Sequence, residues 1–220
     1  MQKKYAIITA MKEEADHIIG YYSLSKINNY KHMTIYENDD IVLLCAGIGK
    51  IQATIATMYL CTTYLFTHCI NIGIAGSLLG NKATIGDVFL IQTIIQHDMD
   101  LPFEGSHLDY AKKPLHLIVP SLDAQKYGFG FHQHGICLTG DQFISDEKKL
   151  AGLRTQFGGD VVEMEAFAIA SVLDLFGKLD TMICIKAISD GADADAKDAH
   201  MDNLDFAMKN SIDVLRDIIG

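Results

Sequence analysis

Arginine is nearly missing from this chain of 220 residues, where it occurs only as Arg154 and Arg216. Enzymes that grip phosphate usually converge several guanidinium groups on it, because the planar fork matches the phosphate oxygens. The chain also carries a net charge of −10, which repels phosphate backbones and anionic lipid. We therefore expect no nucleic acid polymer and no membrane as partner, and instead a small neutral or cationic ligand.

Signals for export, membrane insertion and zinc binding are absent as well. No stretch approaches the roughly 20 apolar residues that span a bilayer. The apolar run at 5–11 is interrupted at once by Lys12, Glu13 and Glu14, so no export signal is expected. The five cysteines form no C-x-x-C pair, which predicts buried free thiols in a reducing compartment. We expect a cytoplasmic protein that holds no metal and no cofactor.

What the sequence does contain is an alternation of apolar runs with helical patterns. Nearly continuous apolar strands predict an α/β fold with a central mixed, mostly parallel sheet and helices on both faces. Because no linker, repeat or low-complexity segment interrupts the chain, residues 1–220 are expected to form a single domain. The expected strands are 5–10, 34–37, 41–46, 69–73, 88–93, 135–139, 160–164 and 182–189. The expected helices begin near 12 and cover 51–66, 146–157, 165–176 and 204–219. Two irregular stretches remain, 97–114 and 190–203, and long loops at strand ends are where α/β folds usually bind ligands.

Four acidic residues end a predicted strand or open a predicted helix. Glu14 follows the first strand, Asp190 follows the last, and Glu163 and Glu165 lie where strand 160–164 becomes a helix. Taken singly, each fits a favourable helix start or a turn. Taken together, buried carboxylates at one sheet edge are electrostatically costly unless a ligand uses them. The set therefore predicts a ligand site at this edge.

Two glycine-rich segments follow other predicted strands, Gly-Ile-Gly-Lys at 47–50 and Gly-Ile-Ala-Gly at 73–76. Glycine there lets the backbone approach a ligand closely. Neither segment has the spacing of a P-loop or a dinucleotide-binding motif.

Two other patterns were considered as metal sites. The acidic run 190–198 lacks the glycine and the terminal glutamate of a calcium loop. His132 and His134 have no third metal ligand nearby.

Five short segments occur in one order along the chain. They are AMKEE at 10–14, GIGK at 47–50, GDQFI at 140–144, VEMEA at 162–166 and AISD at 187–190. In order and spacing they resemble the 5′-methylthioadenosine/S-adenosylhomocysteine nucleosidases of the purine nucleoside phosphorylase/hydrolase superfamily. The resemblance runs over 5–219 and implies that superfamily's fold. It also implies hydrolysis of the N-glycosidic bond of 5′-thio-substituted adenosines with release of adenine. The substrates implied are 5′-methylthioadenosine, S-adenosylhomocysteine, 5′-deoxyadenosine and aminodeoxyfutalosine.

The resemblance also assigns roles to residues. Asp190 would protonate N7 of adenine, and Glu14 would hold and deprotonate the attacking water. Glu165 would bind the ribose hydroxyls, with Met164 against the sugar face. The other substrate-binding residues implied are Phe143 and Ile144 at the base, Met11, Ile48 and Phe206 around the 5′-alkylthio group, and Glu163, Ser189, Ala75 and Gly76. Since the family is dimeric, we expect a homodimer in which the loop around Leu101 and Phe103 reaches the neighbouring pocket.

Two departures from the family pattern leave alternatives open. Ile74 replaces a hydroxyl that the family has near the water and the ribose, and the segment 102–114 differs from the family loop. One alternative is a phosphate-dependent purine nucleoside phosphorylase, which the shortage of arginine disfavours. The other is a catalytically diverged nucleoside-binding paralogue, which the retention of all three carboxylates disfavours.

Overall fold

The computed structural model of the chain describes residues 1–103 and 105–220. Apolar runs form its strands and amphipathic segments form its helices. The strands are β1 Tyr5–Thr9, β2 Ser25–Asn29, β3 Thr34–Glu37, β4 Ile41–Cys45, β5 His68–Ser77, β6 Val88–Gln96, β7 Leu115–His116, β8 Phe131–Thr139, β9 Val161–Glu163 and β10 Met182–Asp190. The helices are α1 Lys12–Tyr22, α2 Lys50–Thr63, α3 Asp109–Lys112, α4 Glu147–Phe157, α5 Ala166–Leu175, α6 Ala196–Asp202 and α7 Leu204–Ile219.

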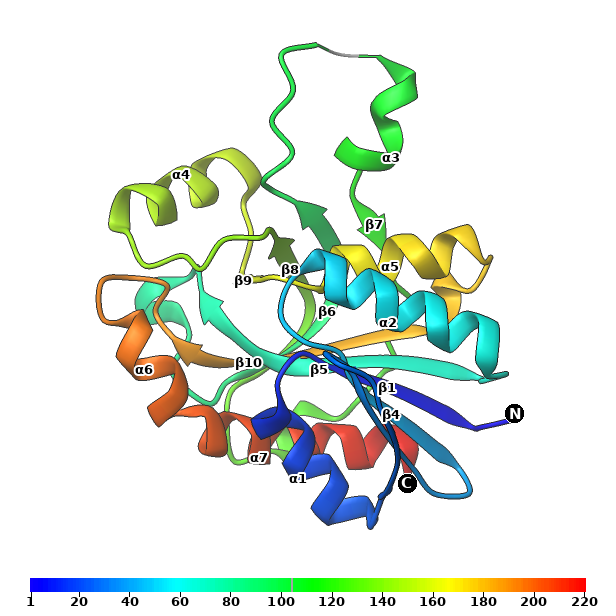
Figure 1. Ribbon diagram of the computed structural model, residues 1–220. Coiled ribbons are helices and arrows are strands. Elements are labelled where there is room, and N and C mark those ends of the chain that lie inside the picture. The colour runs from blue at the N-terminus through cyan, green and yellow to red at the C-terminus, as the bar shows by residue number, and fades with distance from the viewer. Residues whose placement is uncertain (104) are drawn as a thin grey trace.

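The strands form one mixed sheet that partly closes on itself. Its order is β10-β6-β8-β9-β5-β1-β4-β3-β2, with β7 on β6, and β5 pairs with β10 as well. The central pairings of β1 with β4 and β5, of β5 with β10 and of β6 with β8 are parallel. Antiparallel pairings join β6 to β10, β5 to β9 and the β2–β3–β4 edge. The ring of pairings brings the carboxyl ends of β1, β5 and β10 side by side (Figure 1).

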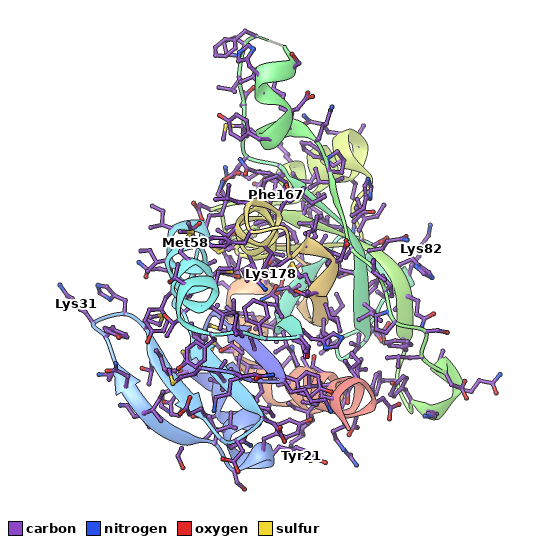
Figure 2. All side chains as sticks on the ribbon, turned by 90° about the vertical axis from the view of Figure 1, so that its right-hand side faces the viewer. Tyr21, Lys31, Met58, Lys82, Phe167 and Lys178 are labelled. Carbon is purple, nitrogen blue, oxygen red and sulfur yellow. The ribbon has the colours of Figure 1, made fainter. Side chains whose placement is uncertain are left out.

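Helices cover both faces of this sheet, because alternate side chains of each strand point to opposite sides. In β1, Ala6 and Ile8 pack with α2 and α5, whereas Tyr5 and Ile7 pack with α1 and α7. Figure 1 shows the two helix pairs on opposite sides of the strands. Figure 2 labels Met58 of α2 and Phe167 of α5, whose helices lie side by side. The predicted α/β fold, with a mixed sheet and helices on both faces, is confirmed.

The main differences from the sequence-based expectation concern polar segments and element ends. β5 continues to Ser77 because its last residues still pair with β10 and β9. The helix expected over 51–66 ends at Thr63, since Tyr64 is extended. β2 was not predicted because all five of its residues are exposed and give no apolar alternation. The two stretches expected to be irregular contain α3 and α6. Within the described residues, no helix is long and apolar enough to span a bilayer.

Candidate active site

A cavity opens at the shared edge where β1, β5 and β10 end. Parallel neighbours bring their carboxyl ends together, so residues that are distant in sequence meet there. The residues that line it are Ala10, Met11, Glu14, Ile48, Ile74, Ala75, Gly76, Gln142, Phe143, Ile144, Val162, Glu163, Met164, Glu165, Ser189, Asp190 and His200. All four acidic residues expected at this edge are among them.

Three backbone N–H groups hold Glu14 in the cavity wall. Its Oε2 accepts hydrogen bonds from the N–H groups of Ala10 and Met11, each at 3.0 Å. Its Oε1 accepts one from the N–H of Ile74, also at 3.0 Å. Burial raises the pKa of Glu14, while these bonds and the charge of Lys186 oppose the rise. The result is a fixed carboxyl group poised to accept a proton.

Asp190 lies at the end of β10, where only 4% of its surface is exposed. The Ser189 hydroxyl donates to Oδ2 at 2.8 Å, and the Ala192 N–H donates to Oδ1 at 2.9 Å. Burial raises the pKa of Asp190 above its ordinary value, against these two hydrogen bonds. A carboxyl group that holds its proton more tightly than usual is suited to act as an acid near neutral pH.

Two glycines of β5 make room for these two carboxyl groups. A Cβ at Gly73 would lie 2.5 Å from Oε1 of Glu14, and a Cβ at Gly76 would lie 2.9 Å from Oδ1 of Asp190. The absence of side chains at Gly73 and Gly76 therefore makes room for Glu14 and Asp190, which line the same cavity.

Glu163 is engaged in a buried ion pair. Its Oε2 lies 2.8 Å from Nζ of Lys186, and both side chains are almost fully buried. Its Oε1 accepts a hydrogen bond of 2.5 Å from the hydroxyl of Thr139. Although burial opposes ionisation, the Lys186 ammonium and these hydrogen bonds lower the pKa of Glu163. Glu163 lines the cavity, but its oxygens stabilise the turn from β9 into α5, where they also accept from the N–H of Ala166.

The pKa of Glu165, two residues further on, is shifted in the opposite direction from that of Glu163. Burial, followed by the negative charge of Glu163, raises the pKa of Glu165 to about 8. Its Oε1 accepts a hydrogen bond of 2.7 Å from the N–H of Gly49. The charge of Lys186 and the hydrogen bond from Gly49 oppose this rise, but burial and the charge of Glu163 outweigh them.

A polar network holds the segment that carries Phe143 and Ile144. Nζ of Lys50 lies 2.7 Å from Oδ1 of Asp98. Asp98 accepts from the N–H of Asp141 at 2.8 Å, and Asp141 in turn accepts from the N–H of Lys50 at 2.8 Å. The network ties the start of α2 to the loops after β6 and β8, so the 141–144 segment is fixed against the cavity.

His200 was not predicted from the sequence. It belongs to α6, within the stretch 190–203 that we expected to be irregular. Its ring lies edge-on to that of Phe143, with the centroids 5.2 Å apart. A helical pattern over 196–202 is too short to be recognised in the sequence, and it is this helix that turns His200 back to the cavity.

Phe206, which the resemblance assigns to the 5′-alkylthio group, is not among the residues that line this cavity. It is 54% exposed and lies over Gly86, beside a separate surface cavity that Tyr127 and Phe129 line. The physical reason is the periodicity of α7. Leu204, Ala207 and Met208 form its buried face, and a residue two positions after Leu204 points away from that face.

Comparisons with known proteins agree on one family. Residues 4–220 match the family described as the phosphorylase superfamily. A 5′-methylthioadenosine/S-adenosylhomocysteine nucleosidase of Buchnera aphidicola is 33% identical over 216 residues, which are 92% of this chain and 91% of that protein. An aminodeoxyfutalosine nucleosidase of Helicobacter pylori is 28% identical over 209 residues, 89% of each chain.

A solved structure has the same fold. It is the 5′-methylthioadenosine/S-adenosylhomocysteine nucleosidase from Neisseria meningitidis in complex with methylthio-immucillin-A. The two chains are 27% identical, the TM-score is 0.78, and the match covers 95% of each.

Replacing Gly73 by alanine tests whether β5 makes room for Glu14. The new methyl group should push the carboxyl group out of its three backbone hydrogen bonds. We expect Gly73→Ala to lower the turnover of a nucleoside substrate about 100-fold, the lower range for loss of a general base. Gly152→Ala is the control, because nothing lies within 4 Å of a Cβ there. A folded Gly73→Ala protein with the turnover of the control would contradict the assignment.

The raised pKa of Glu165 predicts a pH-dependent loss of stability. A carboxyl group whose pKa is raised by folding stabilises the fold fully below its unfolded pKa, near 4.5, and this stability is lost as the pH rises through about 8. Glu165→Gln should therefore lose less stability than the parent protein between pH 5 and 8.5. Denaturant midpoints measured without ligand give the comparison, with Glu13→Gln, at an exposed neighbouring site, as control. Equal pH dependence of the parent and Glu165→Gln proteins would rule out a raised pKa.

Proposed function

The chain belongs to the phosphorylase superfamily, and we propose that it is a nucleosidase that hydrolyses the N-glycosidic bond of 5′-thio-substituted adenosines and releases adenine. The observation that carries the proposal is the pair Glu14 and Asp190. They line one cavity from the ends of two strands, each with its own hydrogen bonds and each beside a glycine of β5. Nucleosidases 33% and 28% identical to nearly the whole chain support it.

The cavity offers a place for each part of such a substrate. The base lies against Phe143 and Ile144, with N7 towards Asp190. The ribose lies against Met164, and its hydroxyls meet Glu165. The 5′ substituent points to the apolar side chains at the mouth of the cavity, Met11 and Ile48. The neighbouring Ala75, Gly76 and Ser189 complete the wall.

Asp190 and Glu14 have different roles in the proposed reaction. Breaking the bond to the base leaves an oxocarbenium-like sugar and an anionic purine unless the base is protonated, as in glycoside hydrolysis. Asp190 delivers that proton to N7, and Glu14 takes one from the water that attacks C1′. The carboxylate charge near the sugar also stabilises the cationic transition state.

Water, and not phosphate, is the nucleophile in this proposal. Arg154 and Arg216 lie outside the cavity lining; Arg154 donates to the Leu78 carbonyl, and Arg216 pairs with Asp213. Lys50, at the start of α2, is already bound to Asp98. A phosphorylase would need cationic groups free to hold phosphate.

The alternative is a protein that binds a nucleoside but has no activity. The hydrogen bonds that fix the carboxyl group of Glu14 argue against it. Ile74 has lost the hydroxyl of the family pattern, but its backbone N–H still binds Oε1 of Glu14. A module that only binds a nucleoside has no use for a buried acid and a buried base in one cavity.

The experiment that tests the function is adenine release from a panel of adenosines. The panel compares 5′-methylthioadenosine, S-adenosylhomocysteine, aminodeoxyfutalosine and 5′-deoxyadenosine with adenosine itself. We expect a clear preference for the 5′-thio compounds, because Met11 and Ile48 offer an apolar surface to the substituent. Binding of the panel without any adenine release would favour the inactive paralogue.

We further propose that residues 1–220 act as one nucleosidase domain in the cytoplasm, in methionine salvage, and as a homodimer. A nucleoside is its ligand, with no nucleic acid polymer and no membrane as partner. On α2, Ile51, Ile55 and Met58 follow the spacing of one helix face and are 70%, 52% and 37% exposed. A second copy of the chain would cover this face and would bring the loop with Leu101 and Phe103 to the neighbouring cavity.

Asp190→Asn should abolish adenine release while the fold and ligand binding survive. An amide has nearly the size of a carboxyl group but cannot deliver a proton, and loss of a general acid costs about 10²–10⁴-fold in rate. Asp195→Asn is the control, since this exposed side chain makes no cap hydrogen bond.

A substrate whose leaving group needs no proton separates the two roles. With 5-methylthioribose linked to p-nitrophenol, Asp190→Asn should recover most of its rate, whereas Glu14→Gln should stay inactive for lack of an activated water. A folded Asp190→Asn protein with near-normal adenine release would remove Asp190 from the mechanism.

The homodimer is tested by sedimentation velocity. We expect the parent protein to sediment as a dimer at micromolar concentration. Ile55→Asp should shift it to the monomer, because a charge would have to be buried in the interface. Ile118→Asp, at a site outside α2 that is also more than half exposed, should remain dimeric. A parent protein that sediments as a monomer would refute the proposal.

A further inference from the structure

Asp98 lies outside the cavity lining, yet three hydrogen bonds converge on its carboxyl group. Nζ of Lys50 donates to both oxygens, at 2.7 and 2.9 Å, and the N–H of Asp141 donates to Oδ2 at 2.8 Å. Only 10% of the Asp98 side chain is exposed. Although burial opposes ionisation, these donors lower the pKa of Asp98. Asp98 is therefore an ionised carboxylate with fixed partners.

Asp98, Asp141 and Lys50 close a ring of hydrogen bonds. Oδ1 of Asp141 accepts from the N–H of Lys50 at 2.8 Å, and the ammonium group of Lys50 returns to Asp98. The ring joins the loop after β6, the loop after β8 and the first residue of α2. A Cβ at Gly49 would lie 3.0 Å from Oδ1 of Asp141, so the turn before α2 lies directly against this carboxyl group.

The ring holds the segment 141–144, to which the proposed function assigns the base. Within residues 1–103 and 105–220, every hydrogen bond from this segment to another element involves Asp141. Packing holds the side chain of Ile144, which is 4% exposed, but Phe143 is 45% exposed. The backbone of the segment therefore depends on Asp141 and its partners for its position.

We propose that Asp98 is a positioning residue that, through Lys50 and Asp141, holds the base-binding segment in place and so increases the affinity of the cavity for adenine. The inference rests on the proposed function for the place of the base. Asp98 touches neither the substrate nor the reacting atoms. Without it, binding of the base would have to order the segment 141–144, and that ordering costs affinity.

Calorimetric titration with free adenine tests the inference without requiring turnover. Asp98→Ala removes the carboxylate, and Lys50→Met removes only the ammonium group, because the N–H of residue 50 still reaches Asp141. Lys50→Arg restores a cation that can bond to both carboxylate oxygens. Asp213→Asn, which breaks an exposed ion pair with Arg216 on α7, is the control.

We expect the dissociation constant of adenine to rise about tenfold in Asp98→Ala and in Lys50→Met, the worth of one charged hydrogen bond. Lys50→Arg and the control should bind adenine like the parent protein. Amide hydrogen exchange should become faster in the segment 140–146 of the two weakened variants, whereas a merely structural role would make it faster throughout the fold.

Two results would overturn the inference. One is an adenine affinity equal to that of the parent protein in folded Asp98→Ala and Lys50→Met. The other is a loss of affinity without faster exchange in the segment 140–146, because Asp98 would then not act through this segment.

Turnover of 5′-methylthioadenosine distinguishes a failure of this inference from a failure of the proposed function. In Lys50→Met we expect KM to rise more than kcat falls, since Glu14 and Asp190 keep their hydrogen bonds. A parent protein that binds adenine with the help of Asp98 but releases none from the nucleoside would refute the nucleosidase alone. Normal turnover of the parent protein, with unchanged adenine affinity in both variants, would refute only the role of Asp98.

Discussion

Four carboxyl groups are removed from water around one cavity in this protein, and their desolvation constrains the surrounding chain. Different interactions offset the desolvation of each carboxyl group. Glu14 accepts three backbone hydrogen bonds, Asp190 accepts one from a hydroxyl and one from the backbone, and Glu163 pairs with Lys186. Glu165 accepts a hydrogen bond from the N–H of Gly49, but burial and the charge of Glu163 raise its pKa to about 8. Lys186 thus keeps Glu163 ionised as a structural group. The pKa values of Glu14, Glu165 and Asp190 are raised instead.

Strand β5 is the element that makes this arrangement possible. It pairs with β1, β9 and β10, which carry or adjoin all four carboxyl groups. Its Gly73 and Gly76 lack the side chains that would strike Glu14 and Asp190. In the proposed mechanism these two carboxyl groups are the acid and the base that hydrolysis of a bond between a sugar and a base uses.

The central strands and the position of the cavity could be predicted from the sequence, because local or repeated sequence patterns indicate them. Apolar runs marked the central strands, and acidic residues at strand ends marked the edge where the cavity lies. Lys186 and His200 were missed for different reasons. Lys186 sits inside an apolar strand, where only the tertiary structure reveals its partner Glu163. His200 depends on a helix of two turns whose position is set by packing, and the same packing turns Phe206 away from the cavity.

The central claim is that a water activated by Glu14 attacks the sugar while Asp190 protonates the leaving base. The most direct measurement is a single turnover of 5′-methylthioadenosine in water labelled with oxygen-18, with inorganic phosphate present, followed by mass spectrometry of the sugar product. To limit exchange of the label at the free sugar, the product is reduced immediately to its alditol. We expect one oxygen-18 atom at C1 and no sugar phosphate. Unlabelled sugar 1-phosphate as the product would contradict the account.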